Sequence, residues 1–268
     1  MLRKFLIAVL ALCVFVLSSC SKYQKLLKNP DSELKYSKAN EYYEKKDYNR
    51  ALQLYDQVKS IYAGTDKAEQ IAYNIAYCYY YQKDMVQAPY SFKNVAQSFP
   101  NSKYAEECAY MSAYCLYLDS PRSSLDQTST KDAIQSLQLF INQYPTSERV
   151  ATCNNQIDQL REKIQQKDFE IALMYYKMGI YMDGYKSAIR SFSNLLTDYP
   201  DTKQREKIMY YVFMSKYRFG INSISEKRKN RLTEAVNAYR ELQMNYPNGT
   251  YTKSASAYNK QLEKEVKI

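Results

Sequence analysis

The feature that most constrains this fold is a ten-residue stretch that returns after 37 residues. Residues 72–81 read AYNIAYCYYY and residues 109–118 read AYMSAYCLYL, so six of the ten positions are identical. A fainter copy stands another 37 residues earlier and keeps three of the shared positions, which are Tyr36, Ala39 and Tyr43. A fixed period of this size is typical of a repeat array. The chain is therefore predicted to fold as a solenoid.

A second pattern recurs five times and predicts the helices of the array. An Ala is followed four residues later by a large apolar residue and seven residues later by another, and these spacings place all three on one helical face. The Ala positions are Ala51, Ala88, Ala133, Ala188 and Ala235. The residues four positions on are Tyr55, Phe92, Leu137, Phe192 and Tyr239, and those seven positions on are Val58, Val95, Phe140, Leu195 and Leu242.

Proline and hydroxyl residues punctuate this pattern. In four of the five copies a Pro stands twelve residues after the Ala and is predicted to end the helix; these are Pro100, Pro145, Pro200 and Pro247. The remaining copy has Ala63 at this position. Two residues after it, and after every Pro except Pro247, a Ser or Thr can cap the next helix; these are Thr65, Ser102, Ser147 and Thr202. Each unit is therefore predicted to be a pair of antiparallel helices. Pro89 falls early in a predicted helix, where we expect it to cost one hydrogen bond and to favour a kink.

This arrangement resembles the tetratricopeptide repeat, in which a small residue precedes the Ala of the second helix by twelve positions. Ala39 and Ala51 have this spacing, as do Ala76 and Ala88. In the third unit an inserted loop at 119–130 separates Ala113 from its partner. The predicted fold is all-α, a superhelical array of about five tetratricopeptide-like helix pairs.

The same patterns predict how the chain is divided. Residues 31–145 are interpreted as an N-terminal module of three repeats, and 182–268 as a C-terminal module. Between them, 146–181 contains no breaker before Gly179 and is predicted to form one long connecting helix. Within the C-terminal module, we expect the basic run 225–231 to be a loop between two helices.

The N-terminus reads as an export signal. Arg3 and Lys4 precede an apolar run at 5–17 that is too short to span a bilayer but fits a signal peptide. The run ends in Leu-Ser-Ser-Cys, which resembles a bacterial lipobox and implies cleavage before Cys20 and lipidation of its sulfur. The predicted parts are a signal peptide at 1–19 and a lipidated tether at 20–30. A plain signal peptide, or a cytosolic protein with an apolar start, is the alternative.

The basic charge of the chain is interpreted in that setting. Residues 1–19 carry two basic residues and no acidic one, so removing them leaves 36 basic and 28 acidic residues. Outside the cytoplasm this balance no longer suggests nucleic acid. It points to anionic headgroups near Lys22, Lys25 and Lys28 or to an acidic protein partner, and a solvated basic face without a partner is the alternative.

Enzymatic function is nearly excluded by what the sequence lacks. There is no His anywhere, which removes Ser-His-Asp and Cys-His catalysis and every His-containing metal site. There is no phosphate-binding glycine loop either. No cofactor and no metal are predicted. Four Cys without metal-type spacing are interpreted as small buried residues, and a disulfide stays open; they are Cys78, Cys108, Cys115 and Cys153.

Tyrosines mark a candidate binding groove. In tetratricopeptide arrays the first helix of each pair lines the concave surface, at positions −3, +1 and +4 from its small residue. Here those positions hold eight Tyr and one Asn: Tyr36, Asn40, Tyr43, Tyr73, Tyr77, Tyr80, Tyr110, Tyr114 and Tyr117. We predict a trough for an extended peptide with aromatic side chains. The alternative is that these Tyr fill the groove without a ligand. The +3 positions, Tyr42, Tyr79 and Leu116, are expected in the core.

Together with the lipobox, several local motifs resemble the BamD family, the lipoproteins of the outer-membrane β-barrel assembly machinery. They are YEKKDYNRA at 43–51, SPRSSLDQT at 120–128, Tyr175-Tyr176 before Gly179, and Ala188-Ile-Arg190. The resemblance covers nearly the whole mature chain. The spacing from Gly179 to Ala188 is two residues longer than in the family, which blurs the register near Arg190.

That resemblance implies a periplasmic scaffold without enzymatic activity, anchored in the outer membrane through lipid on Cys20. It implies that the N-terminal repeats receive the aromatic C-terminal signals of unfolded outer-membrane proteins. It also implies that the C-terminal repeats dock on the POTRA domains of a BamA-like barrel subunit, with Arg190 at the matching position. A general tetratricopeptide adaptor for other cell-envelope proteins is the alternative. Glycan-capturing lipoproteins that contain such repeats rely on Trp, and this chain has none.

Overall fold

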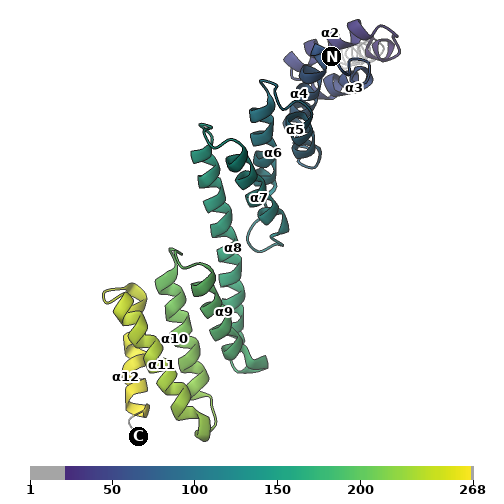
Figure 1. Ribbon diagram of the computed structural model, residues 1–268. Coiled ribbons are helices and arrows are strands. Elements are labelled where there is room, and N and C mark those ends of the chain that lie inside the picture. Colours follow the sequence, from purple (N-terminus) through teal and green to yellow (C-terminus); the bar gives the residue numbers. More distant parts are fainter. Residues whose placement is uncertain (1–21, 267–268) are drawn as a thin grey trace, which may run out of the picture. The chain divides into compact units, whose positions relative to one another are not determined.

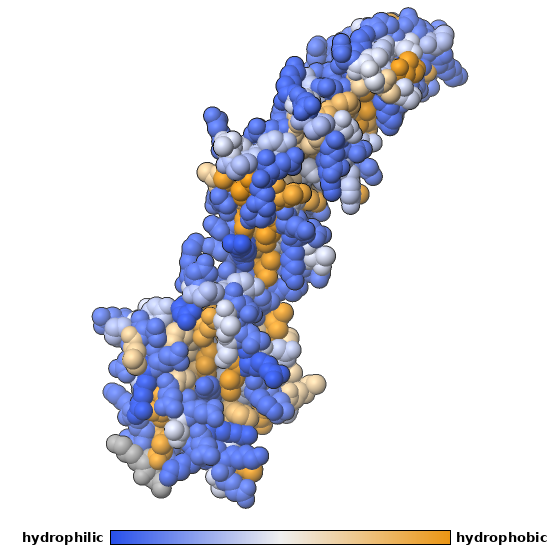
Figure 2. Space-filling model, in the orientation of Figure 1, coloured by the Kyte–Doolittle hydropathy of each residue, from blue (hydrophilic) through white to orange (hydrophobic). Residues whose placement is uncertain are grey.

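The computed structural model describes residues 22–266, and every regular element in this range is helical (Figure 1). Contacts between residues divide the described chain into two compact units. Unit 1 comprises the residues up to Ser120 together with Thr128–Ile157, and unit 2 comprises Pro121–Gln127 together with the residues from Asp158 onward. The face drawn in Figure 2 is largely hydrophilic, and its hydrophobic residues gather in narrow strips.

Unit 1 is a succession of helix pairs. After a short helical segment at 22–27, consecutive helices pack on each other and each pair packs on the next. The pairs are α2 (Ser32–Glu44) with α3 (Tyr48–Val58), α4 (Asp66–Tyr81) with α5 (Gln87–Ser98), and α6 (Ala105–Asp119) with α7 (Thr128–Gln143). The first turns of α8 (Val150–Met178) complete the unit.

Unit 2 continues the same architecture. The remainder of α8 is followed by a short 3-10 turn, by three helices and by a final helix that packs on two of them. These elements are η1 (Tyr181–Asp183), α9 (Gly184–Asp198), α10 (Arg205–Ile221), α11 (Ser225–Asn245) and α12 (Thr250–Val266). The prediction of an all-α, tetratricopeptide-like array of sequentially packed helix pairs is confirmed.

The predicted Ala positions are the points of closest packing. All five Ala of the second helices and the three small residues of the first helices are 0% exposed. The large residues four and seven positions after each Ala are buried as well. An Ala side chain lets two helix backbones approach closely, and the large residues one and two turns on fill the space beside it. The sequence pattern therefore describes the helix-to-helix contacts themselves.

The helix ends follow from the Pro residues. The residue before Pro is restricted to extended backbone, and Phe99, Tyr199 and Tyr246 have φ of −129°, −129° and −135° where α5, α9 and α11 end. The capping prediction needs correction. The hydroxyls of Ser102, Ser147 and Thr202 accept backbone N–H groups two residues on, each at 3.2 Å, and therefore stabilise a turn that precedes the helix.

Thr65 differs from these three residues. It stands directly before α4, but its side chain makes no cap hydrogen bond to the helix. Its hydroxyl donates instead to the carbonyl oxygen of Tyr62, at 2.7 Å. Thr65 therefore closes the preceding turn.

The basic run 225–231 was predicted wrongly as a loop. It forms the first two turns of α11, because it contains no Gly or Pro and is rich in good helix formers. Its side chains are also engaged. The Arg231 guanidinium lies 3.9 Å from the centre of the Phe219 ring, and Arg228 pairs with Glu265 of α12 at 2.6 Å.

Pro89 is accommodated by its place in α5. It is the third residue of that helix, where a backbone N–H has no intrahelical acceptor in a regular first turn. Asp84 caps this end by accepting the N–H groups of Val86 and Gln87. The Pro89 ring is buried and its carbonyl oxygen accepts the Ser112 hydroxyl at 2.9 Å, so Pro89 contributes to the contact between α5 and α6.

Two other segments are more ordered than their composition suggests. Residues 22–27, within the predicted tether, are helical, and buried Tyr23 donates its hydroxyl to the Arg50 carbonyl at 3.1 Å. The inserted loop reaches α8 in unit 2, where Lys167 donates to the Leu125 carbonyl at 2.5 Å. The long helix predicted over 146–181 is seen as α8, whose bounds are Val150–Met178. The functional division into modules stays a prediction.

The cysteines behave as small apolar residues. Cys78, Cys108, Cys115 and Cys153 are all free and buried. Burial raises the pKa of the first three thiols to about 12, so they remain protonated at neutral pH. The interpretation of these residues as packing residues is confirmed.

Candidate functional site

The nine predicted groove residues lie on the first helices of the three pairs in unit 1, namely α2, α4 and α6. Tyr77 and Tyr110 are buried, at 8% and 7% exposure, and the other seven are half-buried. Rings from neighbouring pairs contact one another. Tyr43 packs on Tyr48 at 5.7 Å between ring centres, and Tyr48 stacks on Tyr81 of α4 at 4.6 Å. Ring contacts therefore connect the tyrosines of the first two helix pairs.

Asn40, the single non-aromatic member, is part of an internal hydrogen-bond network. The Tyr55 hydroxyl donates to Asn40 Oδ1 at 2.6 Å, and Asn74 Nδ2 donates to the Tyr55 hydroxyl at 2.7 Å. Gln70 Nε2 in turn donates to Asn74 Oδ1 at 2.8 Å. Because Tyr55 and Asn74 are buried, these bonds satisfy polar groups that would otherwise cost folding free energy. Asn40 thus joins the first two helix pairs.

Glu107 holds two of the predicted groove tyrosines. Its carboxylate accepts the Tyr77 hydroxyl at 2.5 Å and the Tyr73 hydroxyl at 3.2 Å. Burial is the largest cause that raises the pKa of Tyr73 to about 12, and the negative charge of Glu107 is the next largest. The pKa of Tyr77 is also raised, mainly by burial and next by its hydrogen bond to Glu107. Both phenols therefore stay protonated as donors at neutral pH.

Sequence reasoning missed Glu107 and its neighbour Tyr104. The Tyr104 ring stacks on Tyr73 with centres 4.2 Å apart, and its hydroxyl donates to Gln70 Oε1. Glu107 lies 30 residues after Tyr77, in the next helix pair, and no local spacing links the two. Only the packing of α4 against α6 brings them together, so the sequence alone held no signal for this pairing.

The tyrosines of α6 form a stack. Tyr110 and Tyr114 are parallel with ring centres 5.6 Å apart, and Tyr114 and Tyr117 follow at 6.0 Å. Tyr110 is buried against Phe140, and the guanidinium of Arg149 lies 4.5 Å from its ring centre. Among the described residues, Arg149 has no ion-pair partner. One cation therefore lies at the end of an aromatic stack.

Two further tyrosine hydroxyls are available. Those of Tyr80 on α4 and Tyr114 on α6 make no hydrogen bond within residues 22–266, although both rings are in contact with other aromatic rings. Tyr73 and Tyr77, in contrast, use their hydroxyls on Glu107. The hydroxyls of Tyr36 and Tyr43 on α2 also make no hydrogen bond to the described residues.

The +3 positions were predicted as core, and of these Tyr42 packs against a buried hydrophobic cluster. Tyr42, Tyr79 and Leu116 are half-buried. Tyr79 and Leu116 instead line shallow clefts between second helices, with volumes of about 310 and 620 Å³. Each first helix packs between two neighbouring helices, and the position that faces both of them is fully buried. A small residue such as Cys78 occupies that position.

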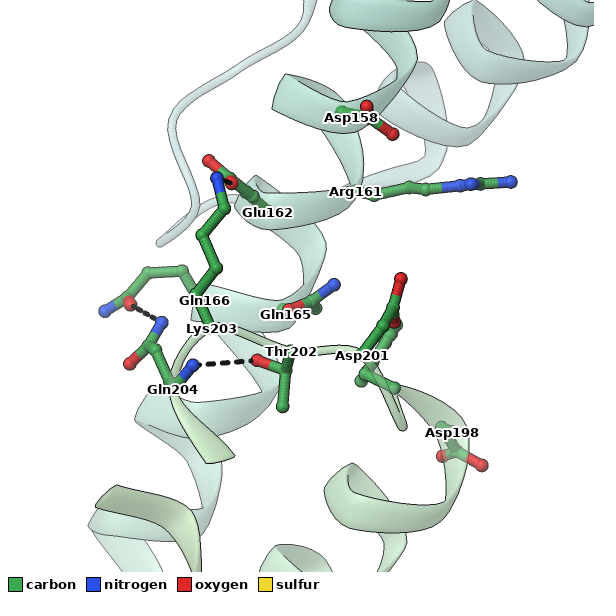
Figure 3. Close-up of a pocket in the computed structure, with 11 residues that line it drawn as sticks. Asp158, Arg161, Glu162, Gln165, Gln166, Asp198, Asp201, Thr202, Lys203 and Gln204 are labelled. Atoms are coloured by element: carbon green, nitrogen blue, oxygen red, sulfur yellow. Dashed lines mark hydrogen bonds and ion pairs between the residues drawn. The ribbon is translucent and has the colours of Figure 1, made fainter. Parts of the chain in front are cut away.

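A polar cleft lies in unit 2 (Figure 3). It has a volume of about 800 Å³ and lies between α8 and the turn that joins α9 to α10. Its side chains pair with one another: Lys203 binds Glu162 at 2.6 Å, and Gln204 donates to Gln166 at 3.3 Å. No group of residues in the described chain has the composition of a metal site. The cleft is a solvated space between repeats.

Two predicted positions remain to be placed. Arg190 is exposed on α9, the second helix of its pair. Cys20, the predicted lipidation site, lies outside the described residues. Within residues 22–266 no helix is both long and apolar enough to span a membrane.

Comparison with known families agrees with this architecture. The family described as "YfiO: Outer membrane lipoprotein" matches residues 28–232, which is most of the chain. A comparison with curated proteins found no match. The fold and the match define a helical-repeat lipoprotein of the outer membrane, a scaffold rather than an enzyme. The chain belongs to the YfiO family, the BamD lipoproteins of the β-barrel assembly machinery.

The tyrosine–carboxylate contact predicts how stability depends on pH. Because the pKa of Tyr73 is raised from 10.0 to about 12 by folding, its contribution is complete below pH 10 and is lost as the pH rises toward 12. Tyr73→Phe should cost about 0.5–1.5 kcal/mol at neutral pH and make the alkaline decline shallower. Urea unfolding between pH 8 and pH 11.5 measures both effects. Exposed Tyr90→Phe is the control, and equal alkaline slopes for wild type and Tyr73→Phe would contradict this assignment.

Proposed function

We propose that this protein is a periplasm-facing scaffold that binds two kinds of partner. Unit 1 binds the C-terminal segments of unfolded outer-membrane proteins, which end in an aromatic residue and a free carboxylate. Unit 2 binds the POTRA domains of the barrel subunit, with Arg190 in the contact. The observation that carries the first part is the Tyr110–Tyr114–Tyr117 stack with Arg149 at its end.

The aromatic part of such a ligand is matched by the tyrosine surface. A Tyr ring offers a large contact area at low entropic cost, and an unoccupied hydroxyl can bind a peptide backbone group. Tyr80 and Tyr114 combine both properties, whereas Tyr73 and Tyr77 are held by Glu107. We therefore assign Tyr80 and Tyr114 to ligand binding and Tyr73 and Tyr77 to the support of the surface.

The carboxylate of the ligand is matched by Arg149. A guanidinium binds a carboxylate through two parallel hydrogen bonds. Arg149 contacts the Tyr110 ring, and Tyr110 stacks on Tyr114, so the cation and the available ring belong to one continuous surface. Glu107 is bound by two tyrosine hydroxyls on α4. Glu106 and Glu148 line a cleft together with Arg149, and Glu106 accepts the Ser147 hydroxyl at 2.6 Å.

Peptide binding tests this assignment. A ten-residue peptide that ends in Phe with a free carboxylate should bind about tenfold more weakly to Tyr80→Ala/Tyr114→Ala, because two aromatic contacts are lost. Amidating the peptide terminus should weaken binding to wild type by about tenfold and leave binding to Arg149→Gln unchanged, because the ion pair is already absent. Fluorescence anisotropy measures these affinities, with exposed Tyr90→Ala on α5 as the control. Equal affinity of the free and amidated peptides for wild type would refute the role of Arg149.

The second surface is tested by charge reversal. Arg190 is exposed on α9, and replacing it by Glu changes the local charge without opening a cavity. Arg190→Glu should weaken binding of the purified POTRA-domain array by at least tenfold, since like charges then face each other. Arg240→Glu, an equally exposed substitution on α11, is the matched control. If both variants bind as wild type does, Arg190 has no part in the contact.

A further inference from the structure

The turn between α8 and α9 presents three large apolar side chains to solvent. Ile180, Tyr181 and Met182 are 61%, 75% and 86% exposed, and they are consecutive in sequence. In Figure 1 this turn is the green connection that joins α8 to α9. Single exposed apolar residues are ordinary, but a contiguous group on a turn indicates an interaction surface.

The backbone of this turn is held in an unusual conformation. Met182 and Asp183, neither of them Gly, have φ of 49° and 55°, in the left-handed region that L residues rarely adopt. Such strain persists only where the surrounding structure enforces it, and it concentrates at functional sites. The turn is therefore built to hold one shape.

Two glycines and one hydrogen bond enforce that shape. Gly179 has φ of 67°, and its carbonyl oxygen accepts the Tyr185 N–H at 2.9 Å. A Cβ at Gly184 would lie 2.7 Å from the Tyr175 carbonyl oxygen, so only Gly lets α9 begin this close to α8.

The charges next to the turn indicate the nature of the partner. Lys186 and Arg190 are both exposed and stand four residues apart on α9, so they form one row that starts near Met182. Residues 184–197 contain no acidic side chain. A complementary surface would therefore carry an apolar pocket beside acidic groups.

We propose that the Ile180–Met182 turn is an apolar plug that enters a pocket on an acidic face of the POTRA-domain array, with Lys186 and Arg190 pairing beside it. This inference rests on the proposed function of unit 2. A fixed strained backbone favours a folded protein over a lipid surface, because insertion into lipid depends on apolar area and does not require a defined turn shape.

The test measures binding of the purified POTRA-domain array by calorimetry at several salt concentrations. Tyr181→Ser/Met182→Ser should weaken binding at least tenfold and keep the salt dependence of wild type, because the lost contact is apolar. Arg190→Glu should weaken binding and flatten the salt dependence, because the lost contact is ionic. The matched control is Ile224→Ser/Met244→Ser, which removes equally exposed apolar side chains elsewhere in unit 2.

The outcomes separate this inference from the function on which it rests. No binding by wild type would refute the proposed function of unit 2. If wild type binds the array and the Tyr181→Ser/Met182→Ser variant binds it equally well, the plug alone would be refuted. Sedimentation with phosphatidylethanolamine–phosphatidylglycerol vesicles, or self-association in analytical ultracentrifugation, would also overturn the plug if either depended on Tyr181 and Met182. Met182→Val keeps an apolar side chain but opposes a positive φ, and it should weaken POTRA binding as well.

Discussion

The close approach of helices at buried Ala residues is the interaction on which the rest of this structure depends. Eight such positions, in the first and second helices of the repeats, have no exposed surface. A larger side chain at any of them would separate two backbones and displace the bulky residues that fill the space one and two turns away. Because the same contact recurs along the chain, every helix pair adopts a similar geometry. The same contact between a buried Ala and its large neighbours is thus repeated along the array.

The repeated geometry also determines where the tyrosines lie. Residues one and four positions after the small residue of a first helix occupy corresponding places in successive pairs. Packing then gives equivalent positions different roles. Tyr77 is buried and bound to Glu107, whereas Tyr114, its counterpart 37 residues on, stays half-buried with its hydroxyl unpaired among the described residues. The proposed binding surface and its support are therefore made from the same repeated residue type.

Much of the fold could be read from the sequence, and the site only in part. The Ala spacing and the Pro residues predicted the helix pairs because both act locally, through helical periodicity and backbone restriction. The contact of Glu107 with Tyr73 and Tyr77 could not be predicted, since it depends on how two repeats meet. The half-buried positions of Tyr79 and Leu116 depend on the same packing. The run 225–231 was misjudged because its charge suggested a loop, whereas its helix propensity decided its structure. The exposed turn at Ile180–Met182 likewise depends on positive φ angles that no residue type there requires.

Two separate binding surfaces are proposed for one chain. They are an aromatic surface in unit 1 and a turn with a row of basic residues in unit 2. The most direct measurement is a calorimetric titration of a Phe-terminated peptide into the protein already saturated with the POTRA-domain array. Separate surfaces predict a peptide affinity equal to that of the free protein, with one peptide and one array bound to each chain. Displacement of the array by the peptide, or an affinity that vanishes in its presence, would contradict the assignment of the two surfaces.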